Sequence, residues 1–211
     1  MNLPRFYPIL DTELLARRGL PVVAAAEAVL EGGARVLQFR HKSFFSRDVF
    51  EQASLVANIC DSAGAFFVMN DRADLAILLH SWLHLGQDDL APGDARKILP
   101  ARSIIGFSTH NEQQLREADR EQVDYLAFGP VFETRSKQNP DPVAGVEELK
   151  RMRALTRKSL VAIGGITRER APAVWEAGAD SVAVIGDMIP EECSKSAVRE
   201  RTEEWLQLLA K

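Results

Sequence analysis

Eight short apolar runs alternate with segments of helical periodicity along the whole 211-residue chain. Consecutive apolar, β-prone residues are typical of a strand that is buried on both faces of a parallel sheet. The expected strands span residues 6–10, 35–40, 65–69, 82–85, 103–107, 125–128, 160–163 and 181–185. No linker and no change of composition interrupts the alternation, so we expect one domain over residues 1–211.

This repeated strand–helix order predicts an α/β fold, a single closed (β/α)8 TIM barrel. A doubly wound open sheet is the alternative, but the first strand-to-helix junction lacks the glycine-rich fingerprint of dinucleotide-binding sheets. In a barrel, functional side chains lie at the carboxyl ends of the strands. The residues that follow each strand are therefore the candidates for a site.

The charge balance indicates no general affinity for polyanions. Lys and Arg number 26 and Asp and Glu number 30, for a formal net charge of −4. We therefore expect no nucleic-acid or membrane partner, and a bound anion would need a local cluster of cations. A homo-oligomer is left open.

The chain carries no signal of export. Cys60 and Cys193 have no metal-ligand spacing and are expected to be ordinary reduced thiols. The first residues lack the pattern of a signal peptide, and no apolar run approaches the length of a membrane span. We expect a soluble, cytoplasmic protein.

The second strand ends in a basic segment. Gln38, Arg40 and Lys42 alternate, which places their side chains on one face, while Phe39 and His41 point the other way. Two cations and an amide suit a polyanion such as a diphosphate. The alternative is an ordinary solvated basic edge.

Acidic and amide residues follow the third and fourth strands. Asn70, Asp71 and Asp89 offer the oxygen ligands that Mg²⁺ uses together with waters and substrate phosphates. Beside the basic segment, they favour a magnesium–diphosphate site. Alternatively, Asp71 caps the next helix, and Asp88 and Asp89 only begin a loop.

Later strands end in residues suited to phosphate. Hydroxyl and ammonium groups that could hold phosphate or shield the site lie at Ser108, Thr134, Ser136 and Lys137. Gly164 and Gly165 after the seventh strand, and Gly186 after the eighth, are typical of a backbone site for a monophosphate. The residues thus predict a barrel with a magnesium–diphosphate end and a monophosphate end, without naming the organic groups.

Several motifs resemble those of the thiamine-phosphate synthase family, in family order and over nearly the whole chain. They cover residues 38–42, 69–72, 84–90, 106–110, 129–132, 134–137, 163–166 and 177–180. The resemblance implies a Mg²⁺-dependent reaction that joins 4-amino-5-hydroxymethyl-2-methylpyrimidine diphosphate to thiazole phosphate and releases pyrophosphate. In that family the pyrimidine C–O bond breaks early, and the thiazole nitrogen captures the cation-like pyrimidine.

The resemblance also implies roles for individual residues. It assigns to the pyrimidine diphosphate Gln38, Phe39, Arg40, His41, Lys42, Asn70, Ser108 and Lys137. It assigns to the thiazole phosphate Thr134, Arg135, Ser136, Gly165, Ile185 and Gly186. Asp71 and Asp89 would hold Mg²⁺, and Arg40, Ser108 and Lys137 would act on the leaving diphosphate.

Several features of the chain depart from the family pattern, among them Ser136 in place of Thr and His41 in place of an acidic residue. Position 186 is Gly where the family usually has Ser, and the segment between Asp71 and Asp89 is shorter than usual. The sister group of thiazole tautomerases has its catalytic histidine where this chain has Pro130 and tends to lose the aspartate at position 71, so the synthase is favoured. A non-catalytic regulatory barrel that binds phosphorylated ligands is the remaining alternative.

Overall fold

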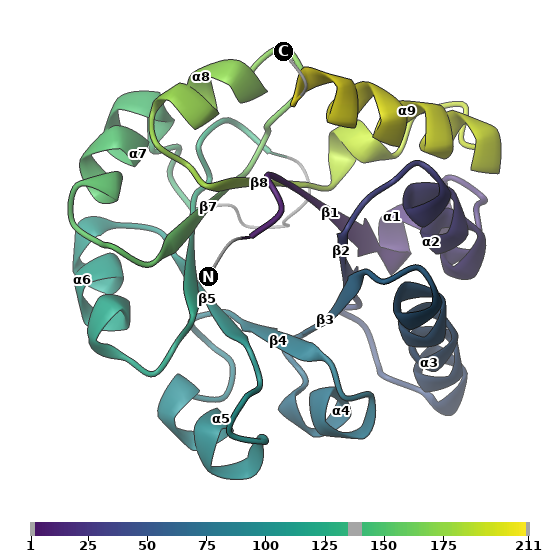
Figure 1. Ribbon diagram of the computed structural model, residues 1–211, viewed down its shortest axis with the longest axis horizontal. Coiled ribbons are helices and arrows are strands. Elements are labelled where there is room, and N and C mark those ends of the chain that lie inside the picture. The colour runs from purple at the N-terminus through teal and green to yellow at the C-terminus, as the bar shows by residue number, and fades with distance from the viewer. Residues whose placement is uncertain (1–2, 135–140, 210–211) are drawn as a thin grey trace.

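The computed structural model describes residues 3–134 and 141–209 and shows a closed barrel of parallel strands ringed by helices (Figure 1). The strands are β1 (Phe6–Asp11), β2 (Val36–Arg40), β3 (Phe66–Asn70), β4 (Trp82–Leu85), β5 (Ile105–Thr109), β6 (Tyr125–Phe128), β7 (Ser159–Ile163) and β8 (Ser181–Val184). The helices are α1 (Thr12–Arg17), α2 (Val22–Glu31), α3 (Arg47–Ser62), α4 (Ala73–Leu78), α5 (Pro92–Ile98), α6 (Glu112–Arg120), α7 (Gly145–Arg153), α8 (Ala171–Glu176) and α9 (Lys195–Leu208), with a short 3-10 turn, η1 (Gly186–Met188).

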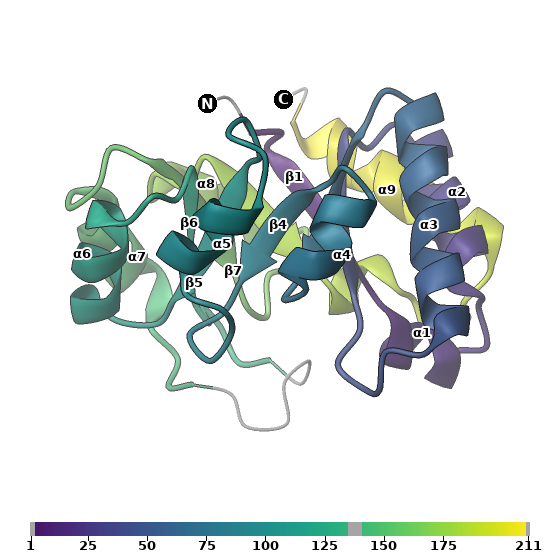
Figure 2. The ribbon, with the colours of Figure 1, turned by 90° about the horizontal axis from the view of Figure 1, so that it is seen from below.

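Each strand pairs in parallel with the next one in the chain, and β1 closes the barrel on β8. Phe6 lies opposite Val182, and Asp11 lies opposite Arg40 of β2. The predicted (β/α)8 barrel is confirmed, and the open-sheet alternative is excluded. Because all strands run the same way, their carboxyl ends meet at one end of the barrel, opposite the end where the chain starts and finishes (Figure 2).

Alternate side chains of the strands build two cores. Outward-facing residues pack under the helices, as where the rings of Phe6 and Trp205 of α9 stack 5.2 Å apart. Inward-facing residues fill the barrel itself, among them Tyr7, Val68 and Tyr125. Burial of such a side chain contributes about 1.5–3 kcal/mol, so the two layers together fix the strand ends on which the site depends.

The helix termini mostly follow the sequence signals. Ser46 and Asn111 cap α3 and α6: each side chain accepts a hydrogen bond from the backbone N–H of the third residue of its helix. Helix α8 begins at Ala171, after a turn over residues 168–170, with Pro172 in its first turn. Helix α1 was not predicted, since six residues are too few to give a periodic signal.

No helix in the two described ranges is long and apolar enough to cross a membrane.

Candidate active site

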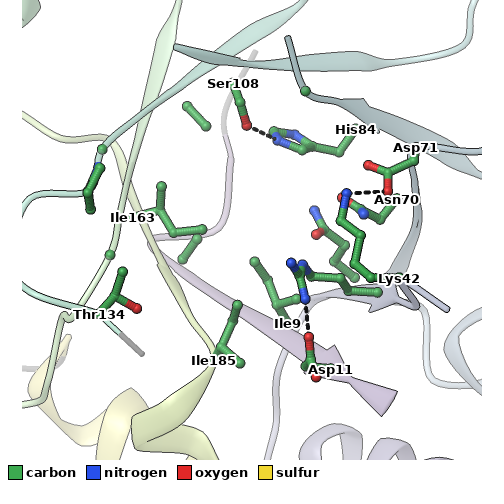
Figure 3. A pocket seen from close by; sticks show the side chains of 18 of the residues that line it. Ile9, Asp11, Lys42, Asn70, Asp71, His84, Ser108, Thr134, Ile163 and Ile185 are labelled. Carbon is green, nitrogen blue, oxygen red and sulfur yellow. Dashed lines mark hydrogen bonds and ion pairs between the residues drawn. The ribbon is translucent and has the colours of Figure 1, made fainter. Parts of the chain in front are cut away.

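A cavity of about 1030 Å³ opens at the carboxyl ends of the strands. Every strand contributes to its lining, and the two sides of the cavity differ in chemistry (Figure 3). Lys42, Asn70 and Asp71 lie on one side, whereas Thr134 and two isoleucines lie on the other. The strand ends that the barrel rule selects therefore do surround one shared space.

The basic segment at the end of β2 forms a basic rim of the cavity, made by Arg40 and Lys42. Arg40 is held in place by an acidic residue that the sequence analysis did not single out. Arg40 forms an ion pair with Asp11, whose other carboxylate oxygen accepts a hydrogen bond from the Leu14 N–H at 2.8 Å. Asp11 is only 5% exposed and caps α1. One buried carboxylate thus orients the Arg40 guanidinium toward the cavity and starts a helix.

Asp71 faces the cavity and does not cap the helix that follows it. The N-cap of α4 is Arg72, which makes no side-chain capping bond, so the capping interpretation of Asp71 is wrong. Asp71 has a φ of 65°, in the left-handed region that Asp and Asn tolerate better than most residues. Its carboxylate accepts a hydrogen bond from the Lys42 ammonium at 2.5 Å.

The Asp89 carboxylate lies close enough to Asp71 to affect the pKa of Asp71. Burial raises the pKa of the Asp71 carboxyl from its ordinary 3.8 to about 6; Lys42 opposes this shift and Asp89 adds to it. Asp89 also accepts a hydrogen bond from the Gly86 N–H at 2.7 Å, so it both shapes the turn after β4 and lines the cavity. A carboxylate whose pKa is raised by burial and by a neighbouring carboxylate marks a place where added positive charge is favoured.

These donors fit a magnesium ion that takes most of its ligands from water and phosphate. Within the described ranges, no three His, Cys, Asp or Glu side chains gather into a complete protein cage for a metal. Mg²⁺ usually binds one or two carboxylates and fills its octahedron with waters and substrate oxygens. Among the described residues, the buried side-chain nitrogen of Asn70, next to Asp71, has no hydrogen-bond partner, so it has a donor to offer.

The floor of the cavity carries a row of hydrogen-bonded polar side chains, of which the sequence predicted Gln38 and Ser108 but not Tyr7, Tyr125 or His84. The Tyr7 and Tyr125 hydroxyls lie 2.9 Å apart across the inside of the barrel, and the Gln38 side-chain nitrogen donates to Tyr7 at 3.0 Å. The Nδ1 of His84 lies 3.0 Å from the Tyr125 hydroxyl, and its Nε2 lies 2.9 Å from the Ser108 hydroxyl. His84 of β4 therefore connects Tyr125 of β6 to Ser108 of β5.

The glycine pair after β7 has a structural reason. Gly164 and Gly165 have φ values of 102° and 60°, and a Cβ on Gly165 would lie 2.2 Å from the Glu133 carbonyl oxygen. Only glycine lets the β6 and β7 loops approach so closely. Both glycines line the cavity, so backbone is exposed there at the predicted monophosphate end.

A family model and a full-length relative identify the same protein family for this chain. A family model described as thiamine monophosphate synthase matches residues 6–188. A thiamine-phosphate synthase of Koribacter versatilis is 43% identical, over 99% of this chain and 97% of the relative. The chain belongs to the thiamine-phosphate synthase family.

Further relatives extend this result. A thiamine-phosphate synthase of Methanoculleus marisnigri is 40% identical over 86% of this chain and 87% of the relative. The solved structure of a thiamine phosphate pyrophosphorylase from Pyrococcus furiosus superposes with a TM-score of 0.84 at 30% identity, covering 98% of this chain and 95% of that one.

The family resemblance assigned sixteen different positions, and most of those that can be placed line the cavity. The placed residues are Gln38, Arg40, Lys42, Asn70, Asp71, Asp89, Ser108, Thr134, Gly165 and Ile185. Arg135, Ser136 and Lys137 lie outside the described residues. The strand-end rule and the family motifs thus converge on the same space.

Three assigned residues do not line the cavity of this family member. Phe39 is fully buried in the outer core, where its ring packs against Phe67. His41 is bonded to the Thr12 hydroxyl at 2.7 Å and lies away from the cavity, as the alternation of side chains along β2 requires. Gly186 begins η1, and a Cβ there would meet no atom within 4 Å.

Proposed function

We propose that the chain joins 4-amino-5-hydroxymethyl-2-methylpyrimidine diphosphate to thiazole phosphate and so forms thiamine phosphate and pyrophosphate. As a thiamine-phosphate synthase family member, the chain is a transferase of thiamine biosynthesis. The observation that carries the proposal is a single cavity in which the cations Arg40 and Lys42 stand beside the carboxylates Asp71 and Asp89. We further propose that the protein acts in the cytoplasm on these small phosphorylated molecules; its oligomeric state stays open.

The diphosphate would bind at the basic rim. The Arg40 guanidinium is fixed by Asp11 and the Lys42 ammonium by Asp71, so both cations are oriented before the ligand arrives. Asp71 and Asp89 would hold Mg²⁺, which neutralises negative charge as the diphosphate leaves. Cations that are already in place stabilise that charge without rearranging, which lowers the barrier for breaking the pyrimidine C–O bond.

The pyrimidine ring would lie over the polar floor of the cavity. Gln38 and Asn70 present amide groups there, and both side chains are at least nine-tenths buried. The unpartnered nitrogen of Asn70 can donate to a ring nitrogen, since a buried donor without an acceptor is costly until a ligand supplies one. These contacts would hold the reacting carbon in line with the leaving oxygen.

The opposite wall would protect the cation-like pyrimidine from water. Val161 and Ile163 of β7, Ala183 of β8 and Ile185, which follows β8, give the cavity an apolar wall. Water that reached the reacting carbon would give an alcohol in place of the thiazole product, so an apolar wall favours the intended capture. No side chain is required as a strong base, because the thiazole nitrogen attacks with its own electron pair.

The thiazole phosphate would bind at the other end of the cavity. Thr134 offers a hydroxyl there, and Gly165 places backbone close to the space. Arg135, Ser136 and Lys137 stay predictions for the thiazole phosphate and for the diphosphate. The two substrates would thus enter from opposite sides of one cavity.

A coupling assay separates this function from its alternatives. Purified protein with both substrates and Mg²⁺ should form thiamine phosphate and release an equal amount of pyrophosphate. Binding of both ligands without product, in an assay where a known synthase works, would instead select the regulatory barrel. Isomerisation of a thiazole carboxylate phosphate would select the tautomerase, which the cavity-lining Pro130 and the presence of Asp71 disfavour.

A further inference from the structure

The hydrogen bonds across the cavity floor join residues of five strands into one chain. It runs from Gln38 on β2 through Tyr7 on β1, Tyr125 on β6 and His84 on β4 to Ser108 on β5, with each heavy-atom distance between 2.9 and 3.0 Å. Because β1 and β6 are not neighbours in the barrel, the Tyr7–Tyr125 bond crosses its interior. This hydrogen-bond chain therefore connects Gln38 and Ser108, two cavity-lining residues on strands that are not neighbours.

Burial forces these groups to satisfy one another. Tyr7 and Tyr125 are at most 1% exposed, Gln38 is 2% exposed and His84 is 9% exposed. A buried hydroxyl hydrogen without an acceptor is destabilising, so each of these protons must be directed at its neighbour in the chain. Burial also raises the pKa of both tyrosines, so each hydroxyl keeps the single proton that it can donate.

The amide nitrogen of Gln38 sets the direction of all the other bonds. This nitrogen can only donate, so the Tyr7 oxygen accepts and the Tyr7 proton goes to Tyr125. The Tyr125 proton then goes to Nδ1 of His84, which must be unprotonated. A neutral imidazole with a bare Nδ1 carries its hydrogen on Nε2 and donates it to the Ser108 oxygen.

We propose that Tyr7, Tyr125 and His84 are positioning residues that form a one-way hydrogen-bond chain, which fixes His84 as the Nε2–H tautomer and turns the Ser108 hydroxyl hydrogen toward the cavity. A charged imidazolium does not fit this chain, because it would donate to both neighbours. The Tyr125 proton would then turn to Tyr7, and the Tyr7 proton would be left buried without an acceptor.

The direction of the chain suits a ligand that only accepts hydrogen bonds. A diphosphate has oxygen acceptors and no donors, so Ser108 can bind it only with the hydrogen of the hydroxyl. If the hydrogen bonds were donated in the opposite direction, the Ser108 hydroxyl would donate to His84, and only an oxygen lone pair would face the diphosphate. This consequence rests on the proposed function, whereas the tautomer of His84 follows from the protein alone.

Nitrogen NMR of the full-length protein tests the tautomer without any assay of activity. In protein with ¹⁵N-labelled histidine at pH 8, the His84 signal, identified by its loss in His84→Gln, should show a protonated Nε2 and a bare Nδ1. His110 provides an internal reference, because its Nδ1 lies 2.6 Å from the Gly129 carbonyl oxygen and must carry the hydrogen. A His84 signal from the Nδ1–H tautomer or from an imidazolium overturns the proposal.

Two variants test the effect on Ser108, with inorganic pyrophosphate and Mg²⁺ as the probe in calorimetry. Tyr125→Phe should mix the two His84 tautomers, leave the His110 signal unchanged and weaken pyrophosphate binding by about three- to ten-fold. Ser108→Ala should weaken it by at least as much, and the double variant should lose no more than Ser108→Ala alone. Additive losses would show that Tyr125 does not act through Ser108; an unchanged tautomer in folded Tyr125→Phe protein would also contradict the proposal.

The outcomes also separate this inference from the proposed function. If no thiamine phosphate forms but His84 is the Nε2–H tautomer, the one-way chain stands and the proposed reaction falls. The tautomer itself is read from the wild-type spectrum, and only the assignment of the His84 signal uses a variant.

Discussion

The Lys42 ammonium donates to the Asp71 carboxylate at 2.5 Å, although the two residues belong to different strand exits, 29 positions apart in the sequence. This ion pair joins Lys42 to the acidic pair, and Asp71 lies partly buried near Asp89. Burial and the nearby Asp89 carboxylate disfavour the ionised form of Asp71, which gives measurable consequences.

Asp71→Asn should stabilise the metal-free protein at neutral pH. The pKa of Asp71 is about 6 in the folded protein and 3.8 ordinarily, so the folded state favours the protonated form. The stabilisation from this protonation is full below about pH 4 and is lost as the pH rises through about 6. Asn resembles the protonated side chain at every pH, so the variant should gain about 1–2 kcal/mol over the wild type at pH 7.5.

Urea denaturation in EDTA at pH 7.5 and pH 4.5 measures this gain. The advantage of Asp71→Asn should shrink at the lower pH, whereas any benefit of Asn for the backbone at φ 65° would stay constant. Asp88→Asn is the matched control, because Asp88 is exposed and lies beside Asp89 in the turn after β4. A gain that does not depend on pH would show that the Asp71 carboxylate is not strained.

Asp11→Asn should impair binding of the pyrimidine diphosphate with little loss of stability. The Asn oxygen can still accept from the Leu14 N–H, but the charge that holds Arg40 is gone. We expect the KM for the pyrimidine diphosphate to rise about ten-fold, equivalent to about 1.4 kcal/mol. Asp11→Ala should show the same raised KM as Asp11→Asn. Its unfolding free energy should be lower by about a further 1 kcal/mol, because the alanine also removes the cap of α1. Equal KM values for the wild type and both variants would exclude a role of Asp11 in orienting Arg40.

Gly186→Ser should improve use of the thiazole phosphate. Gly186 does not itself line the cavity but follows the cavity-lining Ile185, and a Cβ on Gly186 would meet nothing within 4 Å, so a serine hydroxyl can be added beside the cavity without a clash. One added hydrogen bond to a phosphate should lower the KM for the thiazole phosphate by about three- to ten-fold. Gly93→Ser is the control, since its Cβ would lie 4.0 Å from Glu121, an ordinary contact, and the residue is on α5, far in sequence from any cavity-lining residue of β7 or β8. A KM that rises in Gly186→Ser would mean that the glycine itself is needed.

The two thiols should react at very different rates. Cys60 is 1% exposed, and burial raises the pKa of its thiol to about 12, so almost no thiolate is present in the folded protein. Cys193 is partly exposed. Iodoacetamide at pH 8 should therefore label Cys193 first, and label Cys60 only on addition of denaturant, as mass spectrometry of the digested protein can show. Rapid labelling of Cys60 in native protein would contradict its burial.

The sequence predicted the barrel because each strand contains enough consecutive apolar residues to be recognised locally. It also predicted which strand ends carry the site, since a parallel barrel brings all carboxyl ends together. It did not predict contacts that depend on register or on the barrel interior. The Asp11–Arg40 pair requires β1 and β2 to be aligned, and the Tyr7–Tyr125 bond joins strands that are not neighbours.

The family motif was less selective than the geometry of the strand. A motif names every residue in a stretch, so it assigned Phe39 and His41 to the ligand together with Gln38 and Arg40. The alternation of side chains along β2 already places Phe39 and His41 on the other face, and the structure agrees with that alternation.

The Mg²⁺ dependence of product formation tests the central claim most directly. That claim is that Asp71 and Asp89, beside Arg40 and Lys42, form a magnesium–diphosphate site. With both substrates present, thiamine phosphate should form in proportion to bound Mg²⁺, stop with EDTA, and fall at least 100-fold in Asp71→Asn at limiting Mg²⁺, about 2.7 kcal/mol of lost transition-state stabilisation. Undiminished product formation in EDTA, or a near-normal rate in folded Asp71→Asn, would contradict it.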